Sequence, residues 1–158
     1  MPAVAGAGAA RLLRWRPPRV ALGLALGALA AHVAWHGVAA PYGQAPLAGA
    51  ALAAAGVAWM AWAWACFRVA GTPIRPTDAP RVLVDHGPFA LGRNPMYLGI
   101  AATLVGLALA LGVPLLALAA AGFTTIVARV HVPHEEAALK RAFGGWYSDY
   151  AAQVRRWI

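Results

Sequence analysis

The chain has 158 residues, of which 61% are hydrophobic and only 11% are charged. Soluble domains carry about 25% charged residues, and so short a chain cannot bury this much apolar surface in a water-soluble core. The composition therefore excludes an ordinary soluble domain and indicates a single membrane domain, residues 1–158. The net charge is +8. Its basic residues are scattered around apolar stretches, which is typical of membrane topology and anionic lipid contact, and no nucleic-acid partner is expected.

Four apolar segments follow an amino-terminal arm, residues 1–19. They lie at 20–40, 47–67, 96–112 and 114–130. The first two carry no charge over about the 20 residues that cross a bilayer core. The first is also longer than the roughly 7–15 apolar residues of a signal peptide, which favours an uncleaved helix. The last two are divided by Gly112-Val113-Pro114, which predicts a tight helical hairpin. Gly23 and Gly27 have the spacing of a close helix contact in lipid.

The predicted fold class is therefore all-α, a polytopic membrane helix bundle of about four transmembrane helices. Neither Pro41–Pro46 nor Gly112–Pro114 contains a charged residue. Every Lys, Arg, Asp and Glu lies in the arm or in segments 68–95 and 131–158, apart from Arg129 at the end of the fourth apolar segment next to 131–158. Positively charged segments remain on the cytoplasmic side. We therefore expect an integral protein of an inner or plasma membrane, with both termini and both charged segments in the cytoplasm. Oligomeric state is not predicted.

The tail, residues 131–158, has the pattern of a helix. Pro133 and the acids after it are typical of a helix start. Apolar and aromatic residues follow at spacings of three and four, at Leu139, Phe143, Tyr147, Tyr150 and Val154. This stripe predicts an interfacial cytoplasmic helix at the membrane surface. Because the two charged segments flank the hairpin, Arg93, Asn94 and Tyr97 are expected close to His134, Glu135 and Glu136.

Two motifs in these segments resemble a known family. The sequence Arg93-Asn94-Pro95-Met96-Tyr97-Leu98-Gly99 is similar to the Arg-His-Pro-x-Tyr-x-Gly signature of isoprenylcysteine carboxyl methyltransferases and related phospholipid methyltransferases. The second motif is Glu135-Glu136-x-x-Leu139, followed by Phe143-Gly144-x-x-Tyr147-x-x-Tyr150 and Val154-x-Arg156. The resemblance covers about residues 83–158. Asn94 stands where the family has histidine, so a hydrogen-bond donor is kept and a titrating group is lost.

The resemblance implies a membrane methyltransferase that uses S-adenosyl-L-methionine and acts on a lipophilic or lipid substrate entering from the bilayer. The cofactor-binding residues carried over are Arg93, Asn94, Pro95, Tyr97, Gly99, His134, Glu135, Glu136, Leu139, Phe143, Tyr147 and Tyr150. The candidate catalytic residues are Arg93, Glu136 and Arg156. The fork of either arginine can hold a substrate carboxylate or phosphate. Carboxyl O-methylation of an isoprenylcysteine-like or other hydrophobic acid is the first expectation. Phospholipid N-methylation is the alternative.

Other interpretations remain open at this point. His131, His134, Glu135 and Glu136 could be mistaken for a metal site, since two histidines with a carboxylate are the minimum set for a catalytic metal. A solvated helix start is favoured instead, and no metal is expected. His32 and His36 share a face of the first helix and suit either interhelical hydrogen bonds or a functional contact. A small transporter or accessory subunit is the alternative of another class. It would leave both motifs without a role, and no acid lies in a predicted span for proton coupling.

Overall fold

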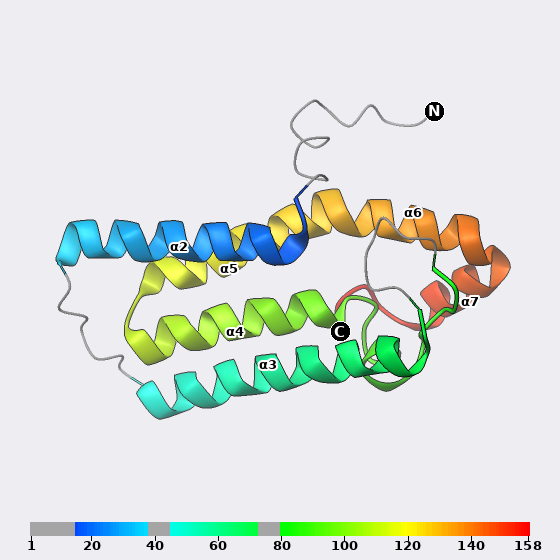
Figure 1. Cartoon of the computed structure of the whole chain (residues 1–158), viewed down its shortest axis with the longest axis horizontal. Coiled ribbons are helices and arrows are strands. Elements are labelled where there is room, and N and C mark those ends of the chain that lie inside the picture. The colour runs from blue at the N-terminus through cyan, green and yellow to red at the C-terminus, as the bar shows by residue number, and fades with distance from the viewer. Residues whose placement is uncertain (1–14, 38–44, 73–79) are drawn as a thin grey trace.

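The computed structural model describes residues 15–37, 45–72 and 80–158, and these residues form helices and connecting turns without strands (Figure 1). The four main helices are α2 (Pro17–His36), α3 (Pro46–Val69), α4 (Pro95–Leu111) and α5 (Pro114–Ile126). Shorter elements are η1 (Gly87–Ala90), η2 (Val127–His131), α6 (Val132–Phe143) and α7 (Gly145–Gln153). The predicted all-α bundle is confirmed. The arm before residue 15, the turn at 38–44 and residues 73–79 lie outside the described residues.

Prolines define where the main helices begin. Pro17, Pro46, Pro95 and Pro114 are each the first residue of their helix. Proline suits this position because its fixed φ is helical and its missing N–H has no partner there. At the other end of α4, Gly112 adopts a left-handed conformation with φ 67°, which ends the helix. The predicted hairpin tip at Gly112–Pro114 is confirmed.

The helices have the dimensions of a membrane protein. Among the described residues, three helices are long and apolar enough to cross a bilayer, namely α2, α3 and the continuous stretch Pro114–Phe143, and α4 is a shorter apolar helix of 17 residues. The main helices alternate in direction, so the charged residues that the structure describes gather at the end where α2 and α4 begin (Figure 1). The protein is therefore a membrane protein with one polar end.

The main helices pack in the order α3, α4, α5, α2, so that α3 and α2 lie at opposite edges (Figure 1). The contact between α3 and α4 is made by glycines seven residues apart, Gly49 and Gly56 on one helix and Gly99 and Gly106 on the other. A Cβ atom on Gly56 would lie 2.7 Å from the carbonyl oxygen of Gly99. These two backbones are therefore in direct contact, as small residues allow in lipid.

Gly23 and Gly27 make no close helix contact with the described residues, and such pairs also arise by chance in a chain so rich in Ala and Gly. Both glycines are exposed on α2, and a Cβ atom on either would meet nothing within 4 Å. The other face of α2 packs on α5 through larger side chains, with Val20, Ala21 and Leu24 against Phe123 and Val127. That contact needs no close backbone approach, which explains why the glycine pair takes no part in it.

The fourth helix does not stop near residue 130 as predicted. It continues through the π-helical turn η2 into α6, where the Val132 N–H bonds to the Val127 carbonyl. Pro133 has no N–H for the usual helical bond, and a local π turn is a common way for a helix to absorb such an interruption. The helix ends instead before Gly144, and α7 folds back (Figure 1). The predicted interfacial helix is thus divided between α6 and α7.

Candidate functional site

A cavity of about 340 Å³ lies at the polar end of the bundle. The start of α2 lines one side and α3 lines the other, while α4, α6 and α7 supply most of the polar groups. Its walls are mainly apolar. The residues that line it are Arg16, Pro17, Pro18, Met60, Phe67, Pro80, Val82, Leu83, Val84, Phe89, Arg93, Asn94, Pro95, Met96, Tyr97, Ile100, Glu135, Glu136, Ala138, Leu139, Tyr147 and Tyr150.

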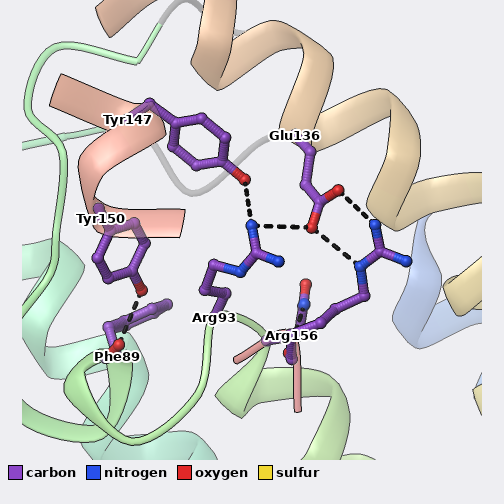
Figure 2. Close-up of polar contacts among 7 residues, drawn as sticks. Phe89, Arg93, Glu136, Tyr147, Tyr150 and Arg156 are labelled. Atoms are coloured by element: carbon purple, nitrogen blue, oxygen red, sulfur yellow. Dashed lines mark hydrogen bonds and ion pairs between the residues drawn. The ribbon is translucent and has the colours of Figure 1, made fainter. Parts of the chain in front are cut away.

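Glu136 connects two arginines at the edge of this cavity (Figure 2). Arg156 binds its carboxylate with a fork, Nε to Oε1 at 3.0 Å and Nη2 to Oε2 at 2.6 Å. Arg93 Nη1 lies 3.4 Å from Oε1. Forked arginine–carboxylate pairs fix orientation as well as charge, and the hydrogen bonds that Arg156 donates to Glu136 raise the pKa of Arg156 above its ordinary value. The carboxylate therefore holds both guanidinium groups in place and leaves one net positive charge.

Two tyrosines of α7 attach this helix to the segment before α4 (Figure 2). Tyr147 accepts a hydrogen bond from Arg93 Nη1 at 3.2 Å, and Tyr150 donates to the carbonyl of Phe89 at 2.7 Å. Burial raises the pKa of both phenols above its ordinary value, and the charge of Glu136 adds to the effect at Tyr147. Both phenols therefore stay protonated at neutral pH, as hydrogen-bonding groups rather than bases.

The C-terminal segment, residues 154–158, lies across the residues before α4. The Arg93 N–H donates to the Arg155 carbonyl at 3.0 Å, and Asn94 Nδ2 donates to the Arg156 carbonyl at 2.8 Å. At Gly92 any Cβ atom would collide with the carbonyl of Trp157. The Trp157 ring packs on the buried cluster formed by α2 and α5. The segment thus joins the first motif to the rest of the bundle.

Glu135 has different surroundings from its neighbour. The Tyr97 hydroxyl donates to its carboxylate, and both residues line the cavity. Within the described ranges no arginine, lysine or histidine lies within ion-pair distance of Glu135. A shielded carboxylate without a cation gains from any cation that binds beside it. Glu135 is therefore the group in this cavity best suited to a positively charged ligand.

Most of the predicted site residues meet at the cavity. Nine of the predicted binding residues line it: Arg93, Asn94, Pro95, Tyr97, Glu135, Glu136, Leu139, Tyr147 and Tyr150. Arg156 approaches from outside, and its fork is engaged by Glu136 rather than open to a substrate.

Three predicted binding residues lie elsewhere. Gly99 is part of the α3–α4 helix contact, where an added Cβ atom would meet the Gly56 carbonyl at 2.7 Å. His134 is exposed on α6 and does not line the cavity. Phe143 packs behind the cavity, against Leu83 and the α7 tyrosines. Gly99 and Phe143 thus have packing contacts in this arrangement, and the predicted cofactor role of all three residues stays a prediction.

Several lining residues were not predicted from the sequence. Most of them come from the start of α2, from α3 and from residues 80–84. Arg16 is the charged member of this group. The only sequence signal for it is a basic residue directly before the two prolines that begin the first helix. The apolar members, such as Met60 and Phe67, are indistinguishable in sequence from lipid-facing residues of the same helix.

The histidines do not support a metal site in the part of the chain that the structure describes. His131 Nε2 lies 3.1 Å from the Trp15 carbonyl oxygen, so its partner is this carbonyl and not Glu135 or Glu136. No group of three metal-ligating side chains gathers among these residues. The rings of His32 and His36 lie 4.8 Å apart near the carboxyl end of α2, whereas the cavity is lined by the start of this helix.

Comparison with known proteins agrees with the two motifs. A family model described as phospholipid methyltransferase matches residues 45–145. No characterised protein and no solved structure matches the chain. The match covers well over half of the sequence, from the start of α3 through both acids of α6 to the start of α7. The chain belongs to the phospholipid methyltransferase family, and this makes it a membrane methyltransferase of lipid-like substrates.

Proposed function

We propose that the protein transfers a methyl group from S-adenosyl-L-methionine to a lipophilic acceptor bound in this cavity. The observation that carries the proposal is the meeting of Arg93, Glu135 and Glu136, from two motifs that are far apart in the sequence, in a cavity of about 340 Å³. Cofactor and small-molecule sites have volumes of roughly 300–1,000 Å³. The polar end is proposed to face the cytoplasm, where the cofactor is found.

The donor set fits this cofactor. Its ammonium and sulfonium groups need an unpaired carboxylate or aromatic faces, which Glu135 and Tyr147 supply. Its carboxylate needs a cation, and Arg93 Nε is buried without a partner among the described residues. When bound, the cofactor supplies an electrophilic methyl group on a cationic sulfur. The fixed Arg93–Glu136–Arg156 group would orient the cofactor, and correct alignment is the main requirement of such a displacement.

The acceptor is proposed to be lipophilic because the remaining walls are apolar and reach from α2 to α3. A hydrophobic carboxylic acid, the first expectation from sequence, needs no base. A lipid amine must lose a proton first, and Glu135 is positioned to accept it. The lipid amine is the second candidate, and the family description supports it.

The first test is calorimetric titration of S-adenosyl-L-methionine into the purified protein in lipid nanodiscs. Arg93→Ala and Glu136→Ala should each weaken binding by roughly tenfold or more, the size of a lost charge-assisted contact. Lys140→Ala is the matched control, because Lys140 is exposed on α6 one helical turn after Glu136. Absence of binding to folded protein, or equal weakening by the control, would overturn the proposal.

The acceptor is then identified with methyl-labelled cofactor and extracted membrane lipids. Alkali hydrolyses a methyl ester and releases labelled methanol, whereas an N-methyl group is stable to the same treatment. Release of label indicates carboxyl O-methylation, and retention in a lipid headgroup indicates N-methylation. Label that enters neither lipid fraction contradicts a lipophilic acceptor.

A further inference from the structure

The cavity contains one cation that the cofactor proposal does not use. Arg93 and Arg156 are both engaged by Glu136. Arg16 also lines the cavity, and no ion pair or side-chain hydrogen bond joins it to another residue of the described ranges. Its charge is therefore open to a ligand from the side of α2.

The backbone of Arg16 is held from two directions. Its carbonyl accepts hydrogen bonds from the Arg19 N–H at 2.8 Å and the Val20 N–H at 3.3 Å. The preceding carbonyl, of Trp15, lies 3.1 Å from His131 Nε2. The residue is extended, with φ −64° and ψ 136°, as a residue before proline prefers. These bonds fix the backbone of Arg16 beside the cavity, and its exposed side chain lies at the cavity wall.

The surroundings of Arg16 suit an amphiphile. Its end of α2 is the polar end of the bundle, and an arginine at the polar end of a membrane helix can bind anionic lipid headgroups. Across the cavity, Met60 and Phe67 of α3 form an apolar wall. Because α2 and α3 lie at opposite edges of the bundle (Figure 1), the cavity can place a charged headgroup near one edge and an apolar chain near the other.

We propose that Arg16 is a specificity-determining residue that binds the non-reacting phosphate of a lipid acceptor. The acceptor role rests on the proposed function, whereas phosphate binding by Arg16 does not. A planar guanidinium matches phosphate oxygens with two parallel N–H bonds. Recognition at this position holds the headgroup beside the carboxylates of α6 and selects phospholipids over neutral lipids with the same chains.

The test is calorimetric titration of three probes into detergent-purified protein. Dihexanoyl phosphatidic acid carries the phosphate and two acyl chains, dihexanoylglycerol carries the same chains without phosphate, and inorganic phosphate carries no chains. Arg16→Gln should weaken binding of the phosphatidic acid roughly tenfold. Arg16→Lys should restore part of it. Binding of dihexanoylglycerol should not change, and inorganic phosphate should bind far more weakly than the lipid.

Arg19→Gln is the matched control, because Arg19 is exposed on the first turn of α2 and does not line the cavity. It should change lipid binding less than twofold. Equal effects of the two glutamine variants, or no effect of Arg16→Gln, would overturn the proposal, since surface charge alone would then explain the binding. Inorganic phosphate binding as tightly as the lipid would overturn the lipid headgroup as the ligand.

The titration also separates this proposal from the proposed function. Binding of S-adenosyl-L-methionine by the wild-type protein is measured in the same preparation. Loss of lipid binding in Arg16→Gln without any cofactor binding by the wild type supports the phosphate site and contradicts the methyltransferase mechanism. Cofactor binding by the wild type, with no effect of Arg16→Gln on lipid binding, supports the methyltransferase mechanism and contradicts the phosphate site.

Discussion

The two adjacent carboxylates of α6 have distinct partners and therefore distinct uses. Glu136 binds two guanidinium groups, and its side chain is 20% exposed against 42% for Arg156. Removing a partly buried carboxylate of this kind leaves like charges side by side, which is costly. Glu135 has the Tyr97 hydroxyl as its hydrogen-bond donor. Glu136 is thus suited to positioning, and Glu135 to contact with a cationic ligand or with a proton.

Gly92 gives a test of whether the C-terminal segment supports the site. In Gly92→Ala the new methyl group collides with the Trp157 carbonyl, so residues 154–158 must move and two hydrogen bonds are lost. Each bond contributes about 0.5–1.5 kcal/mol. We expect a free energy of unfolding lower by about 1–3 kcal/mol and faster cleavage by trypsin after Arg155 and Arg156.

Gly145→Ala is the control for this prediction, because a Cβ atom there meets nothing within 4 Å. Thermal unfolding and a tryptic time course in the same detergent provide both measurements. If Gly92→Ala resists trypsin as the wild type does, the C-terminal segment is not held as the structure shows.

At the residue scale the sequence predicts polar partners better than it predicts apolar walls. Arg93, Glu135 and Glu136 follow from two motifs at the ends of one hairpin, since such ends must be neighbours. Nothing in the sequence indicates that the fork of Arg156 is occupied by Glu136, because the backbone path after Gly144 decides it. Arg16 could not be predicted because its place depends on how α2 packs on α5.

At the element scale the contact between α3 and α4 positions the first motif. Gly99, the last residue of the motif, and Gly106 on the same helix bring the motif against α3, so α4 cannot shift without separating two backbones. The apolar segments were predictable from hydropathy, and the hairpin tip from Gly112 and Pro114, whereas the continuation of the last helix to Phe143 was not. The helix that each helix packs against was not predictable, because glycine is frequent in this chain and only three-dimensional packing distinguishes Gly106 from Gly23.

Gly106→Ala tests this contact. The added methyl group would lie 2.7 Å from the Gly49 carbonyl oxygen, so α3 and α4 must move apart. Overpacking of this kind costs about 1–3 kcal/mol, and we expect a lower thermal midpoint in detergent. Gly23→Ala makes the same change on a helix face with open space and should leave the midpoint unchanged or raise it. Equal midpoints for the two variants would contradict direct backbone contact.

At the scale of the whole molecule, alternating helices collect the charged groups at one end. The continuity of α5 with α6 also positions the two acids, because they lie on the extension of a membrane helix rather than on a separate surface helix. A helix of 30 residues rises about 45 Å, which exceeds the roughly 30 Å hydrocarbon core. Its charged part therefore projects beyond the bilayer on the side of the cavity.

The orientation of this polar end is the last prediction. Basic residues favour the cytoplasmic side, so Asp149 on α7 should be cytoplasmic and Leu47, at the start of α3, should face outside. Both side chains are exposed, and the single native cysteine, Cys66, is buried. In a Cys66→Ala background, a membrane-impermeant maleimide should label Leu47→Cys in intact cells. It should label Asp149→Cys only after permeabilisation, because the bilayer then no longer separates reagent and thiol. The reverse pattern would place the cavity outside the cell, away from the supply of S-adenosyl-L-methionine, and would contradict both the orientation and the proposed cofactor.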